Sequence, residues 1–519
     1  MGLFRATGLV ALFQIVLAAA ALSQDVTLKS RDGTVEISGT LLGFDGEFYR
    51  VDSEYGMLTV DGSGVICSGP GCPDLEAYVA RLRFSGARDA GNALLVNLIE
   101  AFARNEGYGL RREVMSEAAQ DLTLIDEAAG RRVAEISLRL GSSEEGFADL
   151  LAREADLAVS TRPARPEEVS RGLEAELGNL ASAAQARVLA LDALVPVVSR
   201  RNPVAAISVE DLARVFAGEI DNWKQLGGLD APIVLHALAA DRDEAEVMAT
   251  RLLGAAGGAL AAGVQRHANG AELAQAVARD PFAIGLTTLS QSGETKILPL
   301  QDSCGFRAEA TRLTLRTEDY PLVAPVFLYL TKTRLPAVGR EFLRFLRTPA
   351  AQIAVRRAGF VDQAFSRTPL KQQGDRLANA IRAAGAEVPL TDLQRLVEAL
   401  TGWQRLSVTF RFEGGSAELD PQSIANVITL ARALEAGTLG ADELLFAGFT
   451  DGGGAAEANR WLSRKRAVSV RDAVVSAAAT IDRSRLRLRV EGFGEAMPMA
   501  CDDSDWGRGV NRRVEVWVR

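Results

Sequence analysis

Histidine is nearly absent from this chain, which has only His236 and His267 among its 519 residues. Two histidines form no cluster for a metal site and leave little for general-base catalysis. The sequence also has no Gly-x-Ser-x-Gly elbow, no His-Glu-x-x-His motif and no glycine-rich phosphate loop. We therefore expect a protein that is not an enzyme, with no catalytic residue, no cofactor and no metal ion. A hydrolytic cleft is the weaker alternative.

Long hydrophobic runs are missing after the first residues. The longest, 188–198, is broken by Asp192 and is too short to cross a bilayer. Residues 1–23 hold one basic residue, Arg5, then an apolar stretch and a small-residue ending, which is typical of a cleaved secretory signal peptide. No cysteine stands at the expected cleavage point, so a lipoprotein anchor is not indicated. We expect a soluble protein in an extracytoplasmic space.

An excess of positive charge is missing as well. The chain has 58 Lys and Arg against 67 Asp and Glu, for a formal charge of −9, and removal of Arg5 with the signal peptide makes this −10. Such an acidic chain is a poor candidate for nucleic-acid binding. The length suggests about three domains of ordinary globular composition.

Cysteine is scarce, with four residues in the chain. In an exported protein, cysteines indicate disulfides rather than metal ligands. Cys67 and Cys72 enclose the turn Ser-Gly-Pro-Gly, which predicts a disulfide between them. Cys304 and Cys501 lie far apart in the chain. These two cysteines either form a disulfide that joins two domains or remain free thiols, and the sequence leaves both alternatives open.

Two types of local pattern divide the first part of the mature chain. Residues 24–74 consist of short alternating runs separated by turn signals, which predicts a small all-β domain with a structural or partner-docking role. From about Arg81, strands alternate with amphipathic helices, which favours an α/β fold with a largely parallel sheet. One such helix is expected over 92–104, with these residues on its core side: Leu94, Leu95, Leu98, Ile99 and Phe102.

A series of phrases follows in order along the next segment: Asn202-Pro203-Val204, Phe216-Ala217-Gly218, Asn222-Trp223, Asp280-Pro281, Thr317-Glu318-Asp319-Tyr320-Pro321-Leu322 and Gly359-Phe360-Val361. Together they resemble the PstS-like phosphate-binding proteins of ABC transporters over 81–365. The resemblance implies a two-lobed periplasmic binding protein fold of type 2. The chain is then expected to leave the first lobe near Asp192, build the second to about Leu289, and hold a ligand in the cleft.

The resemblance also implies a phosphate site built from hydroxyls and backbone N–H groups at helix starts. By position, Ser85 matches one loop of this site, and Ser160 and Thr161 match a second. Arg162 follows them and is either a ligand residue or a packing residue.

The third loop departs from the family. Its Ser-Gly-Thr triplet is replaced here by 236–244, which includes Asp241, Asp243 and Glu244. Like charges would disfavour an anion there, so we expect weak phosphate binding or none.

The C-terminal segment pairs an acid with a base. Residues 366–404 look like a helical connector, after which Gly448-Phe449-Thr450-Asp451 precedes Asn459-x-x-Leu462-Ser463-x-x-Arg466. A helix that starts after the glycines 452–454 places Asn459, Ser463, Arg466 and Val470 on one stripe. Asp451 would approach Arg466 from the loop, and the two could hold the ammonium and carboxylate of a zwitterion.

These motifs resemble the OmpA-like peptidoglycan-binding domain, an α/β sandwich, over 405–519. The resemblance implies that Asp451 and Arg466 grip the diaminopimelate of the peptidoglycan stem peptide, while Asn459 and Arg512 line or support the site. Phe449 stands where the family usually has histidine, and we expect it to change the rim of the pocket. The alternative is a surface salt bridge between Asp451 and Arg466, which would contribute little.

The two resemblances together predict a periplasmic protein associated with peptidoglycan and the outer membrane. Its expected partners are peptidoglycan, with a small anion such as phosphate and outer-membrane or ABC transporter proteins as further candidates. The alternative function is the phosphate-binding or anion-binding component of an ABC transporter, which would need a permease partner.

Overall fold

The computed structural model describes residues 25–75, 77–254, 258–385, 387–412, 418–478, 480–481 and 486–519. The expected signal peptide, 1–23, lies outside these residues. The chain divides into two compact units, Met1–Ala80 and Arg81–Arg519. None of the helices in the described ranges is long and apolar enough to span a membrane.

The first unit is a small antiparallel sheet with the strand order β4-β3-β2-β1-β5. Its core consists of Val26, Leu28, Tyr49 and Val51. A disulfide joins Cys67 and Cys72, as expected, with the two Cα atoms 5.8 Å apart. The strands are β1 (Val26–Ser30), β2 (Glu36–Phe44), β3 (Phe48–Ser53), β4 (Gly56–Asp61) and β5 (Val65–Ser68).

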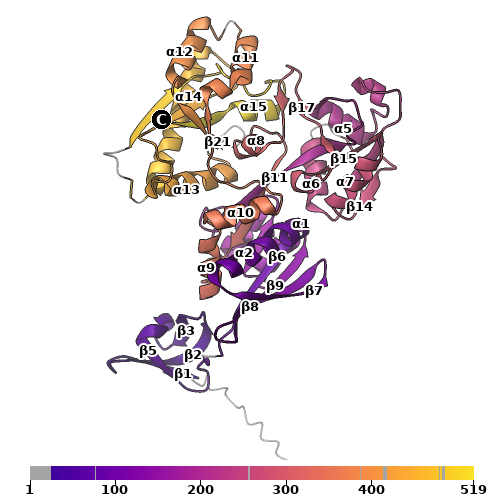
Figure 1. Ribbon diagram of the computed structural model, residues 1–519. Coiled ribbons are helices and arrows are strands. Elements are labelled where there is room, and N and C mark those ends of the chain that lie inside the picture. Colours follow the sequence, from indigo (N-terminus) through magenta and orange to yellow (C-terminus); the bar gives the residue numbers. More distant parts are fainter. Residues whose placement is uncertain are drawn as a thin grey trace, which may run out of the picture. The chain divides into compact units, whose positions relative to one another are not determined.

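The second unit begins with the first lobe of a two-lobed domain, here called the central domain (Figure 1). The helix expected over 92–104 is present as α2, preceded by a π-helical turn, Gly91–Leu95, and all five of its predicted core residues are buried. The elements of lobe 1 are β6 (Ala80–Ala87), α1 (Arg88–Ala90), α2 (Val96–Glu106), β7 (Gly109–Ser116), β8 (Ala119–Asp126), β9 (Arg131–Gly141), α3 (Ser143–Leu151), β10 (Leu157–Ser160) and α4 (Pro166–Glu174).

The expectation of a largely parallel sheet is wrong for this lobe. Residues 109–141 form an antiparallel meander, β7-β8-β9, while β6 and β10 pair in parallel. Alternate residues of β8 and β9 are buried, as in Leu122 and Leu124, so one face of the meander packs on the core. A period of two residues gives strands that can reverse through short turns without a crossover helix.

The long strand β11 (Ala186–Val198) joins the two lobes. Its first part pairs with β19 (Val323–Leu330) of lobe 1 and its last part with β15 (Ala283–Thr288) of lobe 2, so the chain changes lobes just after Asp192. Lobe 2 contains β12 (Ile207–Ser208), α5 (Val209–Ala217), β13 (Val234–Leu238), α6 (Asp243–Val247), β14 (Gln265–His267), α7 (Gly270–Arg279), β16 (Lys296–Ile297), β17 (Leu300–Gln301) and β18 (Arg307–Ala308). The return to lobe 1 adds α8 (Arg312–Arg316), β19, α9 (Ala337–Phe345) and α10 (Pro349–Arg357).

The C-terminal domain, coloured orange to yellow in Figure 1, contains a sheet with the strand order β20-β21-β24-β22-β23. In this sheet only β22 and β23 pair in parallel. Its strands are β20 (Arg367–Pro369), β21 (Gln404–Arg411), β22 (Glu443–Phe449), β23 (Arg487–Gly492) and β24 (Arg513–Val518). Its helices are α11 (Gly374–Ala383), α12 (Leu390–Leu400), α13 (Pro421–Glu435), α14 (Ala456–Ala477) and α15 (Asp505–Asn511).

Alternation along the strands gives this sheet two buried faces. On β22, Leu444 and Phe446 pack with α13 and α14, while Leu445 and Ala447 pack with α11 and α12. The segment 366–404, which the sequence suggested as a connector, thus supplies an edge strand and one helical layer to this domain.

Buried ion pairs join the central and C-terminal domains within the second unit. Asp319, which precedes β19, accepts from Arg405 Nη1 at 2.9 Å and from Arg411 Nη2 at 3.1 Å. Both arginines lie on β21, on the face opposite to Leu406 and Val408.

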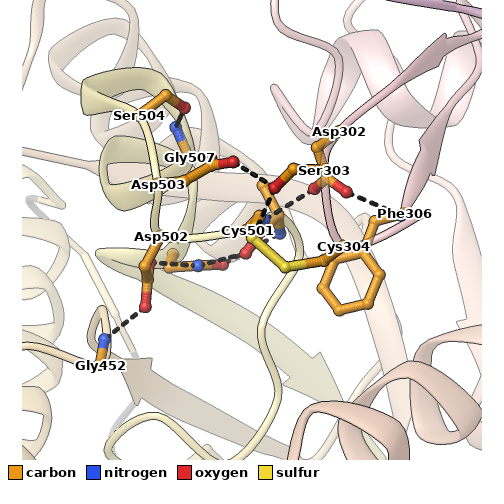
Figure 2. Close-up of a disulfide and its surroundings, with 12 residues drawn as sticks. Asp302, Ser303, Cys304, Phe306, Gly452, Cys501, Asp502, Asp503, Ser504 and Gly507 are labelled. Atoms are coloured by element: carbon orange, nitrogen blue, oxygen red, sulfur yellow. Dashed lines mark hydrogen bonds between the residues drawn. A yellow bond between two sulfur atoms is a disulfide. The ribbon is translucent and has the colours of Figure 1, made fainter.

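A disulfide also joins these two domains. Cys304 and Cys501 are bonded, with their Cα atoms 5.5 Å apart, which decides between the two alternatives for this pair. Figure 2 shows the bridge together with two contacts beside it: Asp302 Oδ2 accepts from the Cys501 N–H at 2.7 Å, and the Ser303 hydroxyl donates to Asp503.

Candidate functional site

The parallel strands β22 and β23 end side by side and place two carboxylates at one edge of the sheet. Gly448 lies opposite Gly492 in the register, and the Thr450 N–H donates to the Gly494 carbonyl at 2.9 Å. Asp451 and Glu495 follow directly, so both acids lie at the carboxyl ends of parallel strands, where α/β folds commonly bind ligands. Burial raises the pKa of Glu495, and nearby carboxylates, Asp451 among them, add to the shift.

Helix α14 supplies the cationic side of the same site. Asn459, Ser463 and Val470 are buried and Arg466 is partly buried, on the stripe that the sequence predicted. Ser463 Oγ accepts from the Gly494 N–H at 3.0 Å and so fixes the helix against the loop after β23. The Arg466 guanidinium lies over the Phe412 ring, 5.1 Å from its centroid.

Asp451 pairs with Arg512 rather than with Arg466. Arg512 Nη1 donates to Asp451 Oδ2 at 2.7 Å, and the two side chains are 21% and 18% exposed. Within the described ranges Arg466 forms no ion pair, and its buried Nη1 has no hydrogen-bond partner. Burial and the neighbouring Arg512 lower the pKa of Arg466, while Asp451 opposes that shift. The alternative that the sequence left open, a surface salt bridge between Asp451 and Arg466, is therefore not found among the described ion pairs.

Four buried polar atoms in these segments lack a hydrogen-bond partner among the described residues: Thr450 Oγ1, Asn459 Nδ2, Arg466 Nη1 and Glu495 Oε1. Each such atom costs about 1–3 kcal/mol of desolvation unless a ligand or water satisfies it. Asn459 Nδ2 and Arg466 Nη1 are donors on the cationic side of the site, and Glu495 Oε1 is an acceptor on the acidic side. The site can therefore hold a carboxylate and an ammonium at the same time.

A further carboxylate, Asp502, supports the loop after β22. Asp502 Oδ2 accepts from the Gly452 N–H at 2.6 Å (Figure 2). Asn511 Nδ2 donates to Asp502 Oδ1 at 2.8 Å. Cys501, the adjacent residue, carries the disulfide to Cys304. The loop that holds Asp451 is thus connected by hydrogen bonds to a segment that is covalently joined to the central domain.

The sequence led us to expect Phe449 at the rim of this site, and this expectation is wrong. Its side chain is fully buried, stacks on Phe493 with centroids 5.6 Å apart, and lies under the Arg513 guanidinium at 4.2 Å. The strand period explains the correction, because Phe449 shares the α11–α12 face of the sheet with Leu445 and Ala447.

The sequence analysis did not assign Thr450, Glu495 or Asp502 to the site. A signal for Glu495 is present in the chain, because Gly492-Phe493-Gly494-Glu495 repeats the pattern of Gly448-Phe449-Thr450-Asp451. Two such phrases at the ends of neighbouring parallel strands place their acids together. No comparable local pattern marks Asp502.

The cleft residues suggested from the sequence are largely engaged within lobe 1. Ser85 Oγ donates to Asp149 at 2.7 Å, and Ser160 Oγ donates to the Arg162 carbonyl at 2.7 Å. Arg162 makes two hydrogen bonds to Glu168, at 2.7 and 2.8 Å. Of these four residues, Thr161 is the one with a side-chain hydrogen bond to a described residue of lobe 2.

That contact is with Asp243, the first residue of α6 in lobe 2. Thr161 Oγ1 donates to Asp243 Oδ2 at 3.1 Å, the Ser143 hydroxyl donates to the same oxygen at 2.7 Å, and the Ser143 N–H donates to Oδ1 at 2.9 Å. Ser143 is the first residue of α3, so the carboxylate lies at a helix N-terminus, where the helix dipole and free N–H groups favour an anion. The sequence analysis missed Ser143, although the Ser142–Glu145 capping box marks this helix start.

Further ion pairs cross the cleft. Arg165 of lobe 1 pairs with Glu246 of lobe 2, and Arg242 Nη1 of lobe 2 lies 3.3 Å from Asp89 Oδ1 of lobe 1. Beside them a cavity of about 20 Å³ remains, which is roughly the space of one water molecule.

Three carboxyl groups line this small cavity: Asp89, Asp192 and Glu244. Burial raises the pKa of Asp192 to about 6. Burial, followed by the charge of Asp89, raises the pKa of Glu244 to about 8. Glu244 is therefore largely uncharged near neutral pH, whereas Asp192 is mostly ionised there.

The two histidines lie on neighbouring parallel strands, with His236 Nδ1 2.8 Å from His267 Nε2. Burial lowers the pKa of both rings. Across the described ranges, no three His, Cys, Asp or Glu side chains are grouped so that they could hold a metal ion.

Two family models match the chain. Residues 112–349 match the PBP superfamily domain and residues 411–512 match the OmpA family. The chain is 26% identical over 280 residues to the protein SphX of Synechococcus elongatus, covering 50% of this chain and 80% of that protein. It is 30% identical over 167 residues to the phosphate-binding protein PstS of Bacillus subtilis, covering 31% of this chain and 53% of that protein.

The chain is also similar to the probable lipoprotein YiaD of Escherichia coli. The two are 33% identical over 105 residues, which covers 20% of this chain and 45% of that protein. The chain therefore spans only about half the length of PstS and of YiaD. Among solved structures, an ABC-type phosphate transport receptor from Vibrio cholerae has a TM-score of 0.41 at 18% identity, with 54% of this chain and 99% of that chain covered.

Proposed function

Since the chain joins a PBP superfamily domain to an OmpA family domain, we propose that it is a periplasmic envelope protein that binds peptidoglycan. In this proposal the C-terminal domain attaches non-covalently to the cell wall, and the central domain is a solute-binding fold with an altered ligand site. The protein is a binding protein rather than an enzyme. We also propose the domain limits 24–74, 81–365 and 405–519, after a cleaved signal peptide over 1–23, with 366–404 as a helical segment that packs on the last of these domains.

The observation that carries the peptidoglycan proposal is the unpartnered guanidinium of Arg466 beside the Asp451–Arg512 pair. Diaminopimelate offers a carboxylate next to an ammonium. Arg466 and Arg512 face the carboxylate, and Asp451 and Glu495 face the ammonium. Asn459 Nδ2 supplies one more donor.

Sedimentation with purified peptidoglycan tests this site. Arg466→Ala and Asp451→Ala are each expected to weaken pelleting by about tenfold or more, because each removes a charge-assisted hydrogen bond to the ligand. Arg471→Ala is the matched control, since Arg471 lies on the same helix and its guanidinium pairs with the neighbouring Asp472. Unchanged pelleting of folded Arg466→Ala protein would reject the site.

For the central domain, we propose that the carboxylate of Asp243 takes the place of a bound anion. The support is its position at the start of α3, with Ser143 and Thr161 as donors. A second anion at that helix start would meet the charge of Asp243. The central domain therefore acts as a closed module of the envelope protein.

The second candidate function is delivery of phosphate or another small anion to an ABC permease. It is favoured by the names of the relatives, which include phosphate-binding proteins. Calorimetry with phosphate separates the two functions. A dissociation constant in the micromolar range for the wild-type protein would support transport and reject the closed module.

A further inference from the structure

A large cavity opens where lobe 1 of the central domain meets helix α13 of the C-terminal domain. Its volume is about 610 Å³, within the range of small-molecule sites, and it is distinct from the interlobe cleft and from the Asp451–Arg466 site. The start of β11, the segment around α9 and α10, and α13 form its walls. We call it the interdomain cavity.

The walls of the interdomain cavity are mostly apolar. Val188, Leu343 and Phe365 line it from the central domain and the segment that follows, and Ile428 lines it from α13. Ile353 of α10 also lines the cavity and is 41% exposed, although it is a large hydrophobic residue. An exposed apolar wall of this kind gains free energy when an apolar group covers it.

The charges in the cavity are all of one sign. Arg187, Arg347 and Arg432 line it, and no aspartate or glutamate is among its described lining residues. A fourth arginine, Arg356, also lines it but pairs with Asp362 at 3.1 Å. The first three arginines form no ion pair with any described carboxylate.

Arg187 is the deepest of these unpaired charges. Its Nη1 is buried and has no hydrogen-bond partner in the described part of the chain. Burial, together with the charges of Arg347 and Arg432, lowers the pKa of Arg187 to about 10. Burial and Arg432 likewise lower the pKa of Arg347. Arg187 is partly buried, and Arg347 and Arg432 are exposed at the mouth of the cavity. Three mutually repelling guanidinium groups without a described counter-charge attract an anion.

We propose that the interdomain cavity binds a single-chain anionic lipid, with the acyl chain along the apolar wall and a phosphate or carboxylate headgroup on Arg187, Arg347 and Arg432. Guanidinium groups bind such headgroups through paired hydrogen bonds. The apolar wall explains why an acyl chain fits better than a free inorganic anion. The arginines explain why a neutral amphiphile fits poorly.

The cavity is preformed in the full-length protein. The Cys304–Cys501 disulfide and the ion pairs of Asp319 hold the central and C-terminal domains together, and the cavity lies between the same two domains. Binding therefore requires little rearrangement, which favours affinity. A bound lipid contacts both domains at once.

Calorimetry and native mass spectrometry of the full-length protein with dodecyl phosphate, below its micelle-forming concentration, test the proposal. One molecule of dodecyl phosphate is expected to bind per chain. Dodecyl maltoside has the same chain with a neutral headgroup, and inorganic phosphate has the charge without a chain, so each is expected to bind at least tenfold more weakly. Equal binding of dodecyl maltoside, or binding of inorganic phosphate that matches dodecyl phosphate, would overturn the proposal.

Arginine variants locate the headgroup. Arg347→Gln and Arg432→Gln are each expected to weaken dodecyl phosphate binding about tenfold, as one charge-assisted contact is lost. Arg344→Gln is the matched control. Arg344 follows α9's buried Leu343, but its side chain is 71% exposed, pairs with Glu341 and does not line the cavity. Binding that survives both cavity variants unchanged would show that the lipid lies elsewhere.

A stability measurement separates a ligand-binding role of Arg187 from a structural one. Arg187→Met keeps the apolar stem but removes a half-buried charge that has no partner. The variant is expected to unfold at a higher temperature than wild type without lipid and to bind dodecyl phosphate at least tenfold more weakly. A lower unfolding temperature with unchanged binding would assign Arg187 a structural role and overturn its place in the site.

Discussion

Asp319 of the central domain and Arg405 of the C-terminal domain form an ion pair at 2.9 Å, with side chains only 4% and 3% exposed. Arg405 also lies 3.4 Å from Glu515, so one arginine connects acids from both domains. Burial alone would raise the pKa of Asp319, but Arg405 and Arg411 outweigh it and hold this pKa below its usual value. At the interface between the domains, the ionised forms of Asp319 and Arg405 therefore stabilise each other.

Loss of Asp319 is expected to destabilise the second unit strongly. Asp319→Ala leaves Arg411 buried without its main counter-charge and Arg405 with Glu515 alone, and breaking a buried pair in this way costs about 3–5 kcal/mol. Urea unfolding measures the change. Asp230→Ala is the control, because Asp230 pairs with Lys224 on the surface, where both side chains are about 70% exposed, and such pairs contribute about 0–1 kcal/mol. Equal effects of the two substitutions would contradict the buried network.

Removal of the Asp243 carboxylate is expected to open an anion site. Asp243→Ala leaves the Ser143 N–H, the Ser143 hydroxyl and the Thr161 hydroxyl without their acceptor, and these donors at a helix start favour phosphate. Calorimetry is expected to detect phosphate binding in the variant and none in wild type.

Asp241→Ala provides the control for this comparison. Asp241 lies two residues away, is 64% exposed and has only a 3.9 Å contact with Arg88. The Asp241→Ala protein is expected to bind phosphate no better than the wild-type protein. A folded Asp243→Ala protein without phosphate binding would show that the α3 start is no anion site even when it is vacated.

The sequence predicted local features well and contacts between distant segments poorly. The stripe of Asn459, Ser463 and Arg466 could be placed because a helical period of 3.6 residues determines which side chains share a face. The contact of Ser143 with Asp243 joins residues 100 positions apart. It depends on how the two lobes close, and no local pattern encodes that closure.

The same limit applies to the charged groups. Arg187 and Arg347 come from separate segments of the central domain, and Arg432 of α13 joins them only because the two domains pack against each other. The antiparallel meander over 109–141 was missed for a different reason. The family resemblance and the strand–helix alternation of the neighbouring segments outweighed the two-residue period of β8 and β9.

Stability of the central domain is expected to fall as the pH rises through neutrality. The pKa of Glu244 is raised from 4.5 to about 8 in the folded protein, so folding favours its protonated form. Its contribution to stability is fully present below about pH 4.5 and is lost as the pH rises through about 8. Asp192 contributes in the same direction up to about pH 6.

Thermal unfolding of Glu244→Gln measures this effect. The glutamine stays uncharged, so the variant is expected to lose less stability than wild type between pH 5 and pH 8.5. Glu219→Gln is the control, because Glu219 is 61% exposed and pairs with Arg214 at the surface. If Glu244→Gln and wild type show the same pH dependence, Glu244 is ionised in the folded state at neutral pH.

The C-terminal domain is expected to discriminate between wall types. A stem peptide with lysine in place of diaminopimelate lacks the carboxylate that Arg466 would bind through two hydrogen bonds, which costs on the order of 2 kcal/mol. Competition between diaminopimelate-type and lysine-type peptidoglycan measures the preference. In Arg466→Ala the preference is expected to disappear. Equal competition for the wild-type protein would remove the zwitterion from the proposal.

The Cys304–Cys501 disulfide is expected to control both the domain interface and the peptidoglycan site. It closes a loop with a sequence separation of 197, and the chain-entropy model gives such a loop about 5 kcal/mol, against about 2 kcal/mol for the short Cys67–Cys72 loop. Cys304→Ser with Cys501→Ser frees the segment that holds Asp502, which accepts from the Gly452 N–H. Hydrogen exchange is therefore expected to increase around Gly452 and Cys501, and pelleting with peptidoglycan to weaken several-fold. The control is Cys67→Ser with Cys72→Ser, which lies in the other unit and is expected to change neither hydrogen exchange at these residues nor pelleting. If this control changes both measurements as much as the Cys304→Ser, Cys501→Ser variant does, the effect is not specific to the Cys304–Cys501 disulfide.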